Sequence, residues 1–253
     1  MHKPRLIARL DVKNEFVIKG IHLEGLRKIG NPNELAKKYY DEGIDEIIFM
    51  DGVASLYERN NLFHIIEKAC REVFIPITIG GGIRSLNDIG LALKAGADKI
   101  ALNTQAIKTP EIITEASQIY GSQCIIGSIE AKQKNNSWEA YCDNGREPTG
   151  KDVVEWALEL EKLGAGELMI TSVDQEGTKK GFDKELIKKI SSLVSIPVIV
   201  SGGAGRVEHI KELTLETEVS GIAIASLIHY KLAEIKQIKK SLSESKILVR
   251  EIV

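Results

Sequence analysis

Short runs of apolar residues alternate along this chain with longer stretches in which apolar and polar positions recur at helical spacing. Each run spans about five mostly aliphatic residues, which is typical of strands buried on both faces of a parallel sheet. The predicted strands are Leu6–Leu10, Glu46–Met50, Ile75–Ile79, Lys99–Leu102, Cys124–Ile129, Glu167–Thr171, Ile196–Val200 and Gly221–Ala225. The predicted helices between them include Asn33–Glu42, Ser85–Ala95, Pro110–Tyr120, Lys151–Leu163 and Asp183–Leu193.

The order of these elements predicts the fold class. Eight strands that alternate with eight helices, without a linker-like stretch, favour a closed (β/α)8 TIM barrel that occupies residues 1–253 as a single domain. A doubly wound open sheet is the alternative that the same pattern allows.

The two halves of the chain resemble each other, which favours the barrel over the open sheet. Pro76 and Pro197 are the second residues of matching strands 121 residues apart (197 − 76), and both strands run into glycines. A repeat of roughly 120 residues with four β/α units in each copy predicts a barrel built from two half-barrels. We expect these half-barrels at roughly residues 1–122 and 123–253.

Composition and charge restrict the function classes further. The chain carries 34 basic and 36 acidic residues, for a net charge of -2, and this balance argues against a nucleic-acid partner. No apolar segment is long enough for a membrane span or resembles a signal peptide. Three cysteines without CxxC spacing and five histidines without metal-ligand spacing predict a cytoplasmic protein with no disulfide, no metal and no cofactor.

Carboxylates follow the first and fifth predicted strands, at Asp11 and Glu130, 119 residues apart (130 − 11). The active face of such a barrel lies at the carboxyl ends of the strands, so the repeat predicts two acids on opposite sides of the mouth. Such a pair can divide general acid and general base work. The alternative is that each acid caps a turn or pairs with Lys13 or Lys132.

Glycine-rich turns follow the third and seventh strands, at Gly81-Gly82 and Gly202-Gly203. Glycine lets backbone N–H groups converge on an anion. Two such turns half a barrel apart predict a substrate with a phosphate at each end. Asn103, Thr104, Ala225 and Ser226 follow the neighbouring strands and are expected to complete the two phosphate sites.

A long segment, Asn14–Asn31, follows the first strand and contains glycine and charged residues. We expect it to form a βα loop that acts as a lid and holds Lys19 over the site, as a cation for a phosphate or for developing negative charge.

These motifs resemble a known family, the cyclase subunits of imidazole glycerol phosphate synthase, over nearly the whole chain. The matching segments include Ala8–Lys13, Val17–Gly20, Gly80–Ile83, Gly96–Lys99, Asn103-Thr104, Gly121–Gln123, Gly164–Glu167, Gly177-Thr178 and Ser201–Gly205. The resemblance implies that ammonia from a glutaminase subunit attacks a doubly phosphorylated ribulosyl-formimino aminoimidazole carboxamide ribotide. The implied products are imidazole glycerol phosphate and aminoimidazole carboxamide ribotide.

The resemblance also implies roles for individual residues. Asp11 and Glu130 share acid/base catalysis, and Lys19 assists from the first loop. The implied substrate-binding residues are Gly81, Gly82, Asn103, Thr104, Thr171, Glu176, Gly177, Gly202, Gly203, Ala225 and Ser226. At the amino-terminal face Arg5, Glu46, Lys99 and Glu167 form a gate for ammonia, or else an ordinary stabilising ion-pair network. Asp98 and Gln123 belong to the surface where the glutaminase docks.

The sequence departs from the family at two acids. The family usually has Asp where this chain has Glu130 and Glu176, and the extra methylene moves each carboxylate by roughly an ångström. These departures leave open an ammonia-dependent synthase subunit for a surface-polysaccharide or flagellar sugar. A barrel that only docks or activates a glutaminase is the non-enzymatic alternative.

Overall fold

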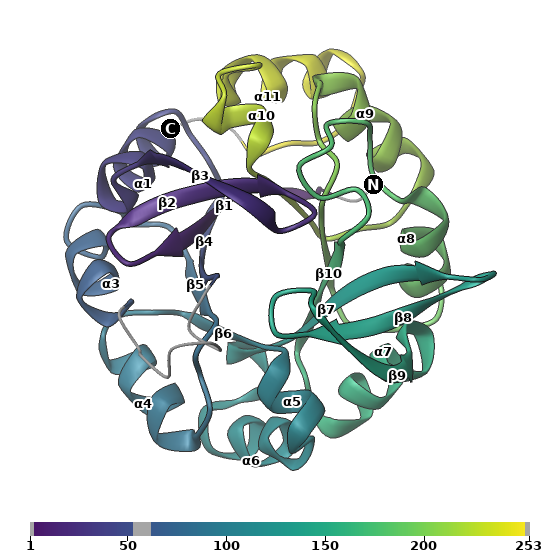
Figure 1. Ribbon diagram of the computed structural model, residues 1–253. Coiled ribbons are helices and arrows are strands. Elements are labelled where there is room, and N and C mark those ends of the chain that lie inside the picture. The colour runs from purple at the N-terminus through teal and green to yellow at the C-terminus, as the bar shows by residue number, and fades with distance from the viewer. Residues whose placement is uncertain (1–2, 53–61, 251–253) are drawn as a thin grey trace.

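The computed structural model describes residues 3–52 and 62–250, and eight parallel strands form a closed barrel in it (Figure 1). In ring order they are β1 (Arg5–Lys13), β4 (Glu46–Asp51), β5 (Ile77–Gly80), β6 (Lys99–Leu102), β7 (Ile125–Lys134), β10 (Glu167–Ser172), β11 (Val198–Ser201) and β12 (Gly221–Ile224). β12 pairs with β1 in parallel and so closes the ring. The predicted TIM barrel is confirmed.

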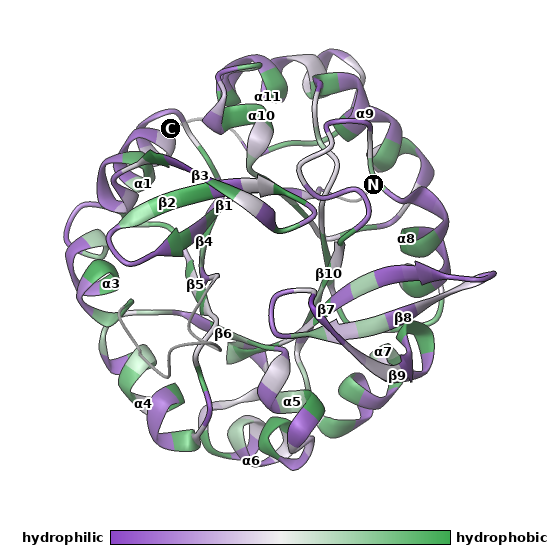
Figure 2. Cartoon of the chain, viewed as in Figure 1, coloured by the Kyte–Doolittle hydropathy of each residue, from purple (hydrophilic) through white to green (hydrophobic). Residues whose placement is uncertain are grey.

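Helices surround the barrel, and their apolar sides face the strands (Figure 2). They are α1 (Pro32–Asp41), α3 (Phe63–Ala69), α4 (Leu86–Lys94), α5 (Thr104–Lys108), α6 (Glu111–Tyr120), the 3-10 turn η1 (Ser122–Cys124), α7 (Val153–Leu163), α8 (Lys184–Ser191), α9 (Val207–Glu216), α10 (Ser226–His229) and α11 (Ile235–Glu244). Side-chain caps fix several starts: Asn31 accepts N–H bonds at α1, Asp152 does so at α7, and Ser85 forms a capping box with Asp88 at α4. Among the residues described, no helix combines the length and apolarity needed to span a bilayer.

Two of the differences between the predicted and the observed strand boundaries have one cause. The third and seventh barrel strands begin at Ile77 and Val198, two residues later than predicted. Pro76 and Pro197 directly precede them, and a proline has no N–H to donate to the ladder.

The segment that follows β1 is a β-hairpin rather than the predicted loop. Its strands β2 (Phe16–Ile21) and β3 (Glu24–Gly30) extend from β1 in antiparallel fashion and lie across the mouth in Figure 1. A second extension, β8 (Ser137–Cys142) and β9 (Glu147–Asp152), continues from β7 in the same way. None of these four strands was predicted from the sequence.

The two extensions occupy equivalent places in the sequence repeat. Each hairpin turn starts at an asparagine with left-handed backbone, Asn14 with φ 55° and Asn135 with φ 54°, and these residues lie 121 apart (135 − 14). Asparagine tolerates this conformation better than most residues do, so it suits a tight turn. Gly81 and Gly202 also have positive φ and the same separation. The predicted division into half-barrels at residue 122 stays a prediction, which these equivalent backbone features support.

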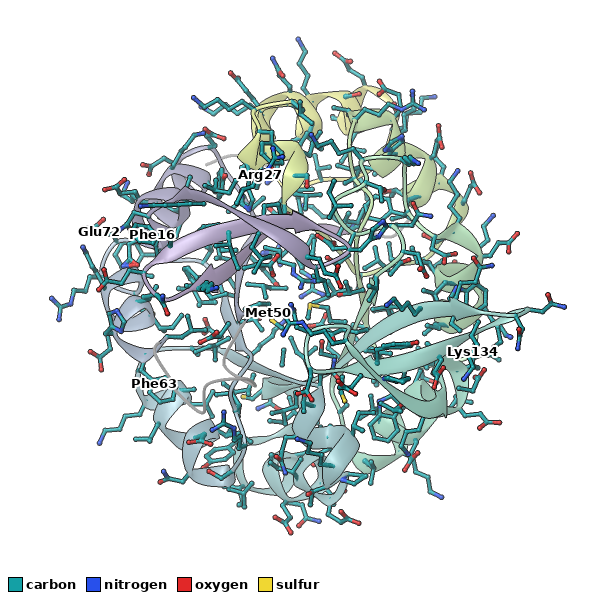
Figure 3. All side chains as sticks on the ribbon, in the orientation of Figure 1. Phe16, Arg27, Met50, Phe63, Glu72 and Lys134 are labelled. Carbon is teal, nitrogen blue, oxygen red and sulfur yellow. The ribbon has the colours of Figure 1, made fainter. Side chains whose placement is uncertain are left out.

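The interior of the barrel is apolar at its centre. A buried cluster distinct from the strand–helix core consists of Ile7, Ile48, Ala101, Ile126, Met169, Ile199 and Ala223. Met50 packs against this cluster, and Figure 3 places it near the centre of the ring. An apolar layer therefore separates polar groups at the two ends of the barrel.

A buried ion pair fastens the last helix to the first strands. Lys239 on α11 donates to Asp45 at 2.6 Å, and the other oxygen of Asp45 accepts the N–H of Leu6 at 2.8 Å. Both side chains are buried, so neither charge has water as a substitute partner.

We predict that Asp45→Ala lowers the free energy of unfolding by about 3 to 5 kcal/mol, because it leaves the Lys239 ammonium buried without a counter-charge. Urea unfolding measures this change. Asp41→Ala is the control, since Asp41 pairs with Lys37 on the exposed side of α1 and its loss should change stability by less than about 1 kcal/mol. Equal losses in the two variants would contradict the prediction.

Candidate active site

Asp11 and Glu130 lie on opposite sides of the barrel mouth. Asp11 is near the carboxyl end of β1, Glu130 is on β7, and these strands are four steps apart around the ring in either direction. Both side chains are buried. The structure thus places the two acids on opposite sides of the mouth, as predicted, but their surroundings differ.

Asp11 is held between two cations. Arg9 Nε donates to Oδ1 at 2.8 Å, and Lys19 Nζ donates to Oδ2 at 3.3 Å. Burial by itself would raise the pKa of Asp11, but the charges and hydrogen bonds of Arg9 and Lys19 outweigh it and lower the pKa to about 2. Asp11 is therefore a carboxylate at neutral pH.

Glu130 has no cation within ion-pair distance among the described residues. Its Oε2 accepts the backbone N–H of Gly145 at 2.8 Å. Burial raises the pKa of Glu130 to about 7, and the negative charge of Asp11 adds to the rise. The Gly145 hydrogen bond, the charge of Arg9 and the hydrogen bond to the Asn103 side chain lower the pKa, but by less than burial raises it. The two acids thus have widely separated pKa values, as expected where one group takes up a proton and the other gives one.

Lys19 lies on β2, not on an open loop, and its side chain is 2% exposed. It makes an ion pair with Glu176 as well as with Asp11. Burial lowers the pKa of Lys19, and the charge of Arg9 lowers it further, while Asp11 opposes the shift. The predicted cation over the site is present, but in this structure two carboxylates neutralise it.

The hairpin is closed over the segment that follows β10. His22 N–H donates to the carbonyl of Glu176 at 2.8 Å, and the His22 ring contacts the Val173 carbonyl at 2.9 Å. Gly177 has φ 73°, and a Cβ there would lie 2.2 Å from the Gly20 carbonyl oxygen. Glycine at 177 is therefore required for the hairpin to come this close.

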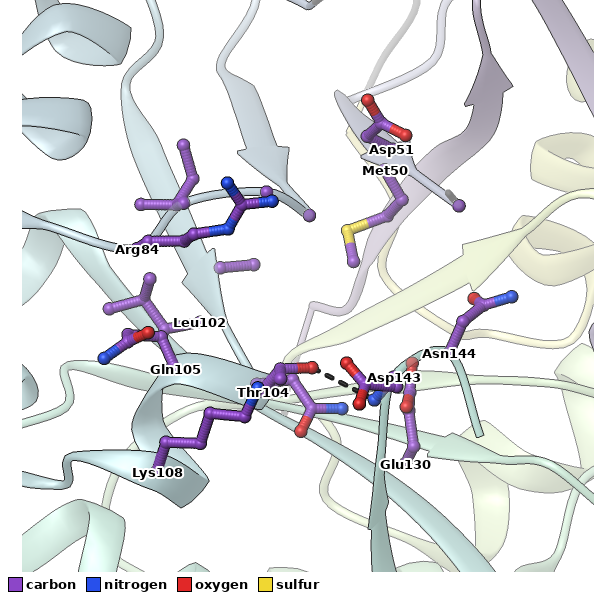
Figure 4. Close-up of a pocket in the computed structure, with 16 residues that line it drawn as sticks. Met50, Asp51, Arg84, Leu102, Thr104, Gln105, Lys108, Glu130, Asp143 and Asn144 are labelled. Atoms are coloured by element: carbon purple, nitrogen blue, oxygen red, sulfur yellow. Dashed lines mark hydrogen bonds between the residues drawn. The ribbon is translucent and has the colours of Figure 1, made fainter. Parts of the chain in front are cut away.

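A pocket of about 100 Å³ opens beside the first glycine turn (Figure 4). It is lined by Met50, Asp51, Gly52, Gly81, Gly82, Ile83, Arg84, Ala101, Leu102, Asn103, Thr104, Gln105, Lys108, Glu130, Asp143 and Asn144. The predicted residues Gly81, Gly82, Asn103 and Thr104 thus meet Glu130 in one cavity. Gly81 has φ 82°, and a Cβ there would lie 2.3 Å from the Asp51 carbonyl oxygen.

Thr104 and Asn103 already have protein partners in this pocket. Thr104 Oγ1 accepts the N–H of Asp143 at 3.0 Å, the bond that is dashed in Figure 4. Asn103 donates to the carbonyl of Tyr141 at 3.2 Å, while its amide oxygen is buried without a partner. Both side chains are therefore oriented by the β8–β9 extension.

The second glycine turn has a different support. Gly202 and Gly203 have φ 100° and 106°, and the Gly203 carbonyl accepts the N–H of Gly181 at 2.9 Å. The hydroxyl of Ser226 is buried there without a hydrogen-bond partner. Buried hydroxyls nearly always have a partner, so this oxygen is available to a ligand. Ala225 precedes it and is also buried.

Four charged residues form a ring at the opposite end of the barrel. Arg5 Nη1 donates to both oxygens of Glu46, at 2.9 and 3.0 Å, and Arg5 also pairs with Glu167. Lys99 lies 2.9 Å from Glu167 and 3.6 Å from Glu46. Two cations and two carboxylates therefore balance in a closed ring at the start of four strands.

Several residues of the site have no role among the predictions from the sequence. Arg9 donates to Thr171 and Ser201 as well as to Asp11, and Arg84 and Lys108 line the pocket. The alternation of β1 could have identified Arg9, because residues 5, 7, 9 and 11 of one strand face the same side. Arg84 and Lys108 carry no comparable signal. The described part of the chain has no cluster of three or more His, Cys, Asp or Glu side chains able to bind a metal ion.

A barrel with two buried acids of separated pKa at its mouth, and glycine turns beside them, has the arrangement of an enzyme of the (β/α)8 class. Residues 5–234 match a family described as histidine biosynthesis protein. The chain is 59% identical over 209 residues to the imidazole glycerol phosphate synthase subunit HisF of Legionella pneumophila, which covers 82% of this chain and 99% of that protein. It is 43% and 42% identical over 250 residues to the HisF subunits of two Dehalococcoides mccartyi strains, with 99% of each chain covered. The chain belongs to this histidine biosynthesis family and, within it, to the HisF subunits.

We predict that Glu130→Gln stabilises the fold at high pH. Above pH 7 the folded parent must hold a buried carboxylate whose pKa is about 7, whereas in the unfolded chain the pKa is near 4.5. Because the folded parent keeps this proton to a higher pH than the unfolded chain does, its free energy of unfolding falls as pH rises, by roughly 3 kcal/mol at pH 8. Urea unfolding should show the variant more stable than the parent by about that amount at pH 8, and by less than about 1 kcal/mol at pH 5. The same difference at both pH values would contradict the predicted protonation.

Proposed function

We propose that the chain is the cyclase subunit of a glutamine-dependent imidazole glycerol phosphate synthase, an enzyme that uses ammonia from a glutaminase subunit. Its substrate is a ribulosyl-formimino aminoimidazole carboxamide ribotide with a phosphate at each end. The products are imidazole glycerol phosphate, aminoimidazole carboxamide ribotide and the water that carries the ribulosyl carbonyl oxygen. We also keep the prediction of a cytoplasmic location.

One observation carries this proposal: the ion-pair ring and the acid pair lie at opposite ends of one barrel, with an apolar layer between them. A small neutral molecule such as ammonia crosses an apolar layer at a far smaller desolvation penalty than an ion does. Delivery from the ring to the mouth therefore suits ammonia and excludes bulk water from the reaction.

The two acids divide the proton transfers. Asp11, the carboxylate, accepts a proton from the attacking nitrogen, and Glu130, the neutral acid, gives its proton to the nitrogen that leaves as the carboxamide ribotide. The same nitrogen also bonds the ribulosyl carbonyl carbon, whose oxygen leaves as water, and transfer of one proton from Asp11 to Glu130 restores the starting state. The two glycine turns, with Asn103, Thr104 and Ser226, bind the terminal phosphates.

The departures from the usual family pattern have local explanations. The longer side chain of Glu130 reaches the Gly145 N–H, and that of Glu176 reaches Lys19. A role on a surface-polysaccharide or flagellar sugar is not favoured, because the relatives compared above are all synthase subunits by name. A docking-only barrel is not favoured either, since both acid positions keep carboxylates.

Docking of the glutaminase on the amino-terminal face is supported by apolar side chains exposed there. Phe74 and Ile119 are 74% and 60% exposed, and Leu215 is 63% exposed. All three lie at or just beyond helix ends that lead into the next barrel strand, around the ring. Asp98 shares this face, but its carboxylate accepts the Ile77 N–H at 2.8 Å, so its role is partly structural.

Purified protein with ammonium salt and the ribulosyl-formimino substrate tests the activity. We expect turnover that falls on the order of 10² to 10⁴-fold in Asp11→Asn and in Glu130→Gln, because each removes one proton-transfer group. Glu130→Asp is the conservative control and should keep more activity than Glu130→Gln. Absence of turnover by the correctly folded parent would rule out the proposed function.

Co-purification with a HisH-type glutaminase from the same organism tests the docking face. Phe74→Glu combined with Ile119→Glu should weaken the complex by at least about tenfold, because apolar anchors dominate such interfaces. Leu158→Glu is the matched control, since Leu158 is 41% exposed but lies in the middle of α7. Equal binding by the double variant and the control would place the partner elsewhere. Asp98→Lys is avoided because it also breaks the bond to Ile77.

A further inference from the structure

Arg9 occupies a position between the apolar layer and the acid pair. Along β1, Arg5 belongs to the charged ring, Ile7 to the apolar layer and Asp11 to the mouth. Arg9 shares their side of the strand and lies between Ile7 and Asp11, with 2% of its surface exposed. Its guanidinium is thus buried at the floor of the site.

Three contacts fix this guanidinium. Nε donates to Asp11 at 2.8 Å, and Nη1 donates to the hydroxyls of Thr171 at 2.8 Å and Ser201 at 3.2 Å. These acceptors come from β1, β10 and β11, so the planar guanidinium of Arg9 connects three strands of the barrel. A guanidinium keeps its charge at every accessible pH.

The charges at the mouth do not balance if every acid is ionised. Arg9 and Lys19 supply two positive charges, whereas Asp11, Glu176 and Glu130 supply three carboxyl groups, all of them buried. Asp11 and Glu176 each have a cation at ion-pair distance, whereas the hydrogen-bond donors to Glu130, the Gly145 N–H and the Asn103 side chain, are neutral. The geometry therefore leaves one proton in the cluster and assigns it to Glu130.

We propose that Arg9 is a positioning residue that orients Asp11 as the proton acceptor and thereby leaves Glu130 as the proton donor of the pair. The assignment deepens the function proposed above and rests on it. Arg9 acts through Asp11, and not by bonding to the reacting atoms.

The other titratable groups near the pair do not change this balance. His229 on α10 binds the Arg9 carbonyl at 3.1 Å and the Tyr39 hydroxyl at 2.8 Å, and burial lowers the pKa of His229 to about 4, so its ring is neutral. Burial raises the pKa of the Cys142 thiol, which is also neutral. The pocket beside Glu130 adds the acids Asp51 and Asp143 and the cations Arg84 and Lys108. Lys132 is one cation more than these pairs, but its Nζ lies 3.5 Å from the Gly145 carbonyl oxygen and 4.8 Å from the centroid of the Tyr141 ring, and it makes no ion pair with Glu130 among the described residues.

The test compares Arg9→Met with the parent in the ammonium-dependent assay across pH 5 to 9. We expect kcat to fall on the order of 100-fold, with KM for the substrate changed less than about threefold, and a displaced pH profile. NMR titration of ¹³C-labelled aspartate carboxyls, assigned with Asp11→Asn, should move the midpoint of Asp11 from about 2 to above 4. Arg71→Met, on the exposed turn after α3, is the control and should match the parent in both measurements.

Arg9→Lys separates charge from geometry. It keeps a positive charge but loses the planar guanidinium with its several N–H donors, so Asp11 should still titrate below pH 4. The kcat of Arg9→Lys should lie between that of Arg9→Met and that of the parent. This variant decides the question if Arg9→Met does not fold. An unchanged pH profile together with an unchanged Asp11 titration in Arg9→Met, or a kcat of Arg9→Lys equal to that of the parent, would overturn the role of Arg9.

The NMR titration does not depend on turnover. A parent without ammonium-dependent activity would therefore refute the proposed function, whereas an Asp11 midpoint that ignores Arg9 would refute only the present inference.

Discussion

Eight strand ends bring charged side chains into a space that water barely reaches, and a charge in such a space is stable only beside an opposite one. The amino-terminal end meets this condition with two cations and two carboxylates in a closed ring. The mouth has two cations and three acids. The extra acid must keep a proton, and a buried proton with a pKa of about 7 is available for catalysis at neutral pH.

The hairpin and the glycine turns serve this cluster. Lys19 reaches Asp11 and Glu176 only because β2 and β3 fold across the mouth, and Gly20 approaches Gly177 only because Gly177 carries no side chain. The second extension supplies Gly145, whose N–H is the partner of Glu130. Equivalent extensions in the two half-barrels therefore support unequal acids, one paired with cations and one not.

The sequence predicted the barrel because buried parallel strands and amphipathic helices have distinct hydrophobic periods, and the repeat resolved the choice between barrel and open sheet. Asp11 and Glu130 were predicted because they follow equivalent strands. The hairpins were missed because Phe16–Ile21 and Glu24–Gly30 mix glycine and charge with apolar residues, so no period-2 alternation marks them. The alternation of β1 could have placed Arg9 beside Asp11, but its contacts to Thr171 and Ser201 could not be predicted, because these residues are more than 160 positions away and only the closed barrel brings them together.

The central claim is that Glu130 holds the one proton that the charges of the mouth cannot balance. NMR titration of protein labelled with ¹³C at the glutamate carboxyls measures this most directly, with Glu130→Gln used to assign the signal. The account predicts a Glu130 midpoint near pH 7, far above the range of exposed glutamates. A midpoint below pH 5 would mean that Glu130 is ionised beside Asp11 and Glu176, and it would contradict the account.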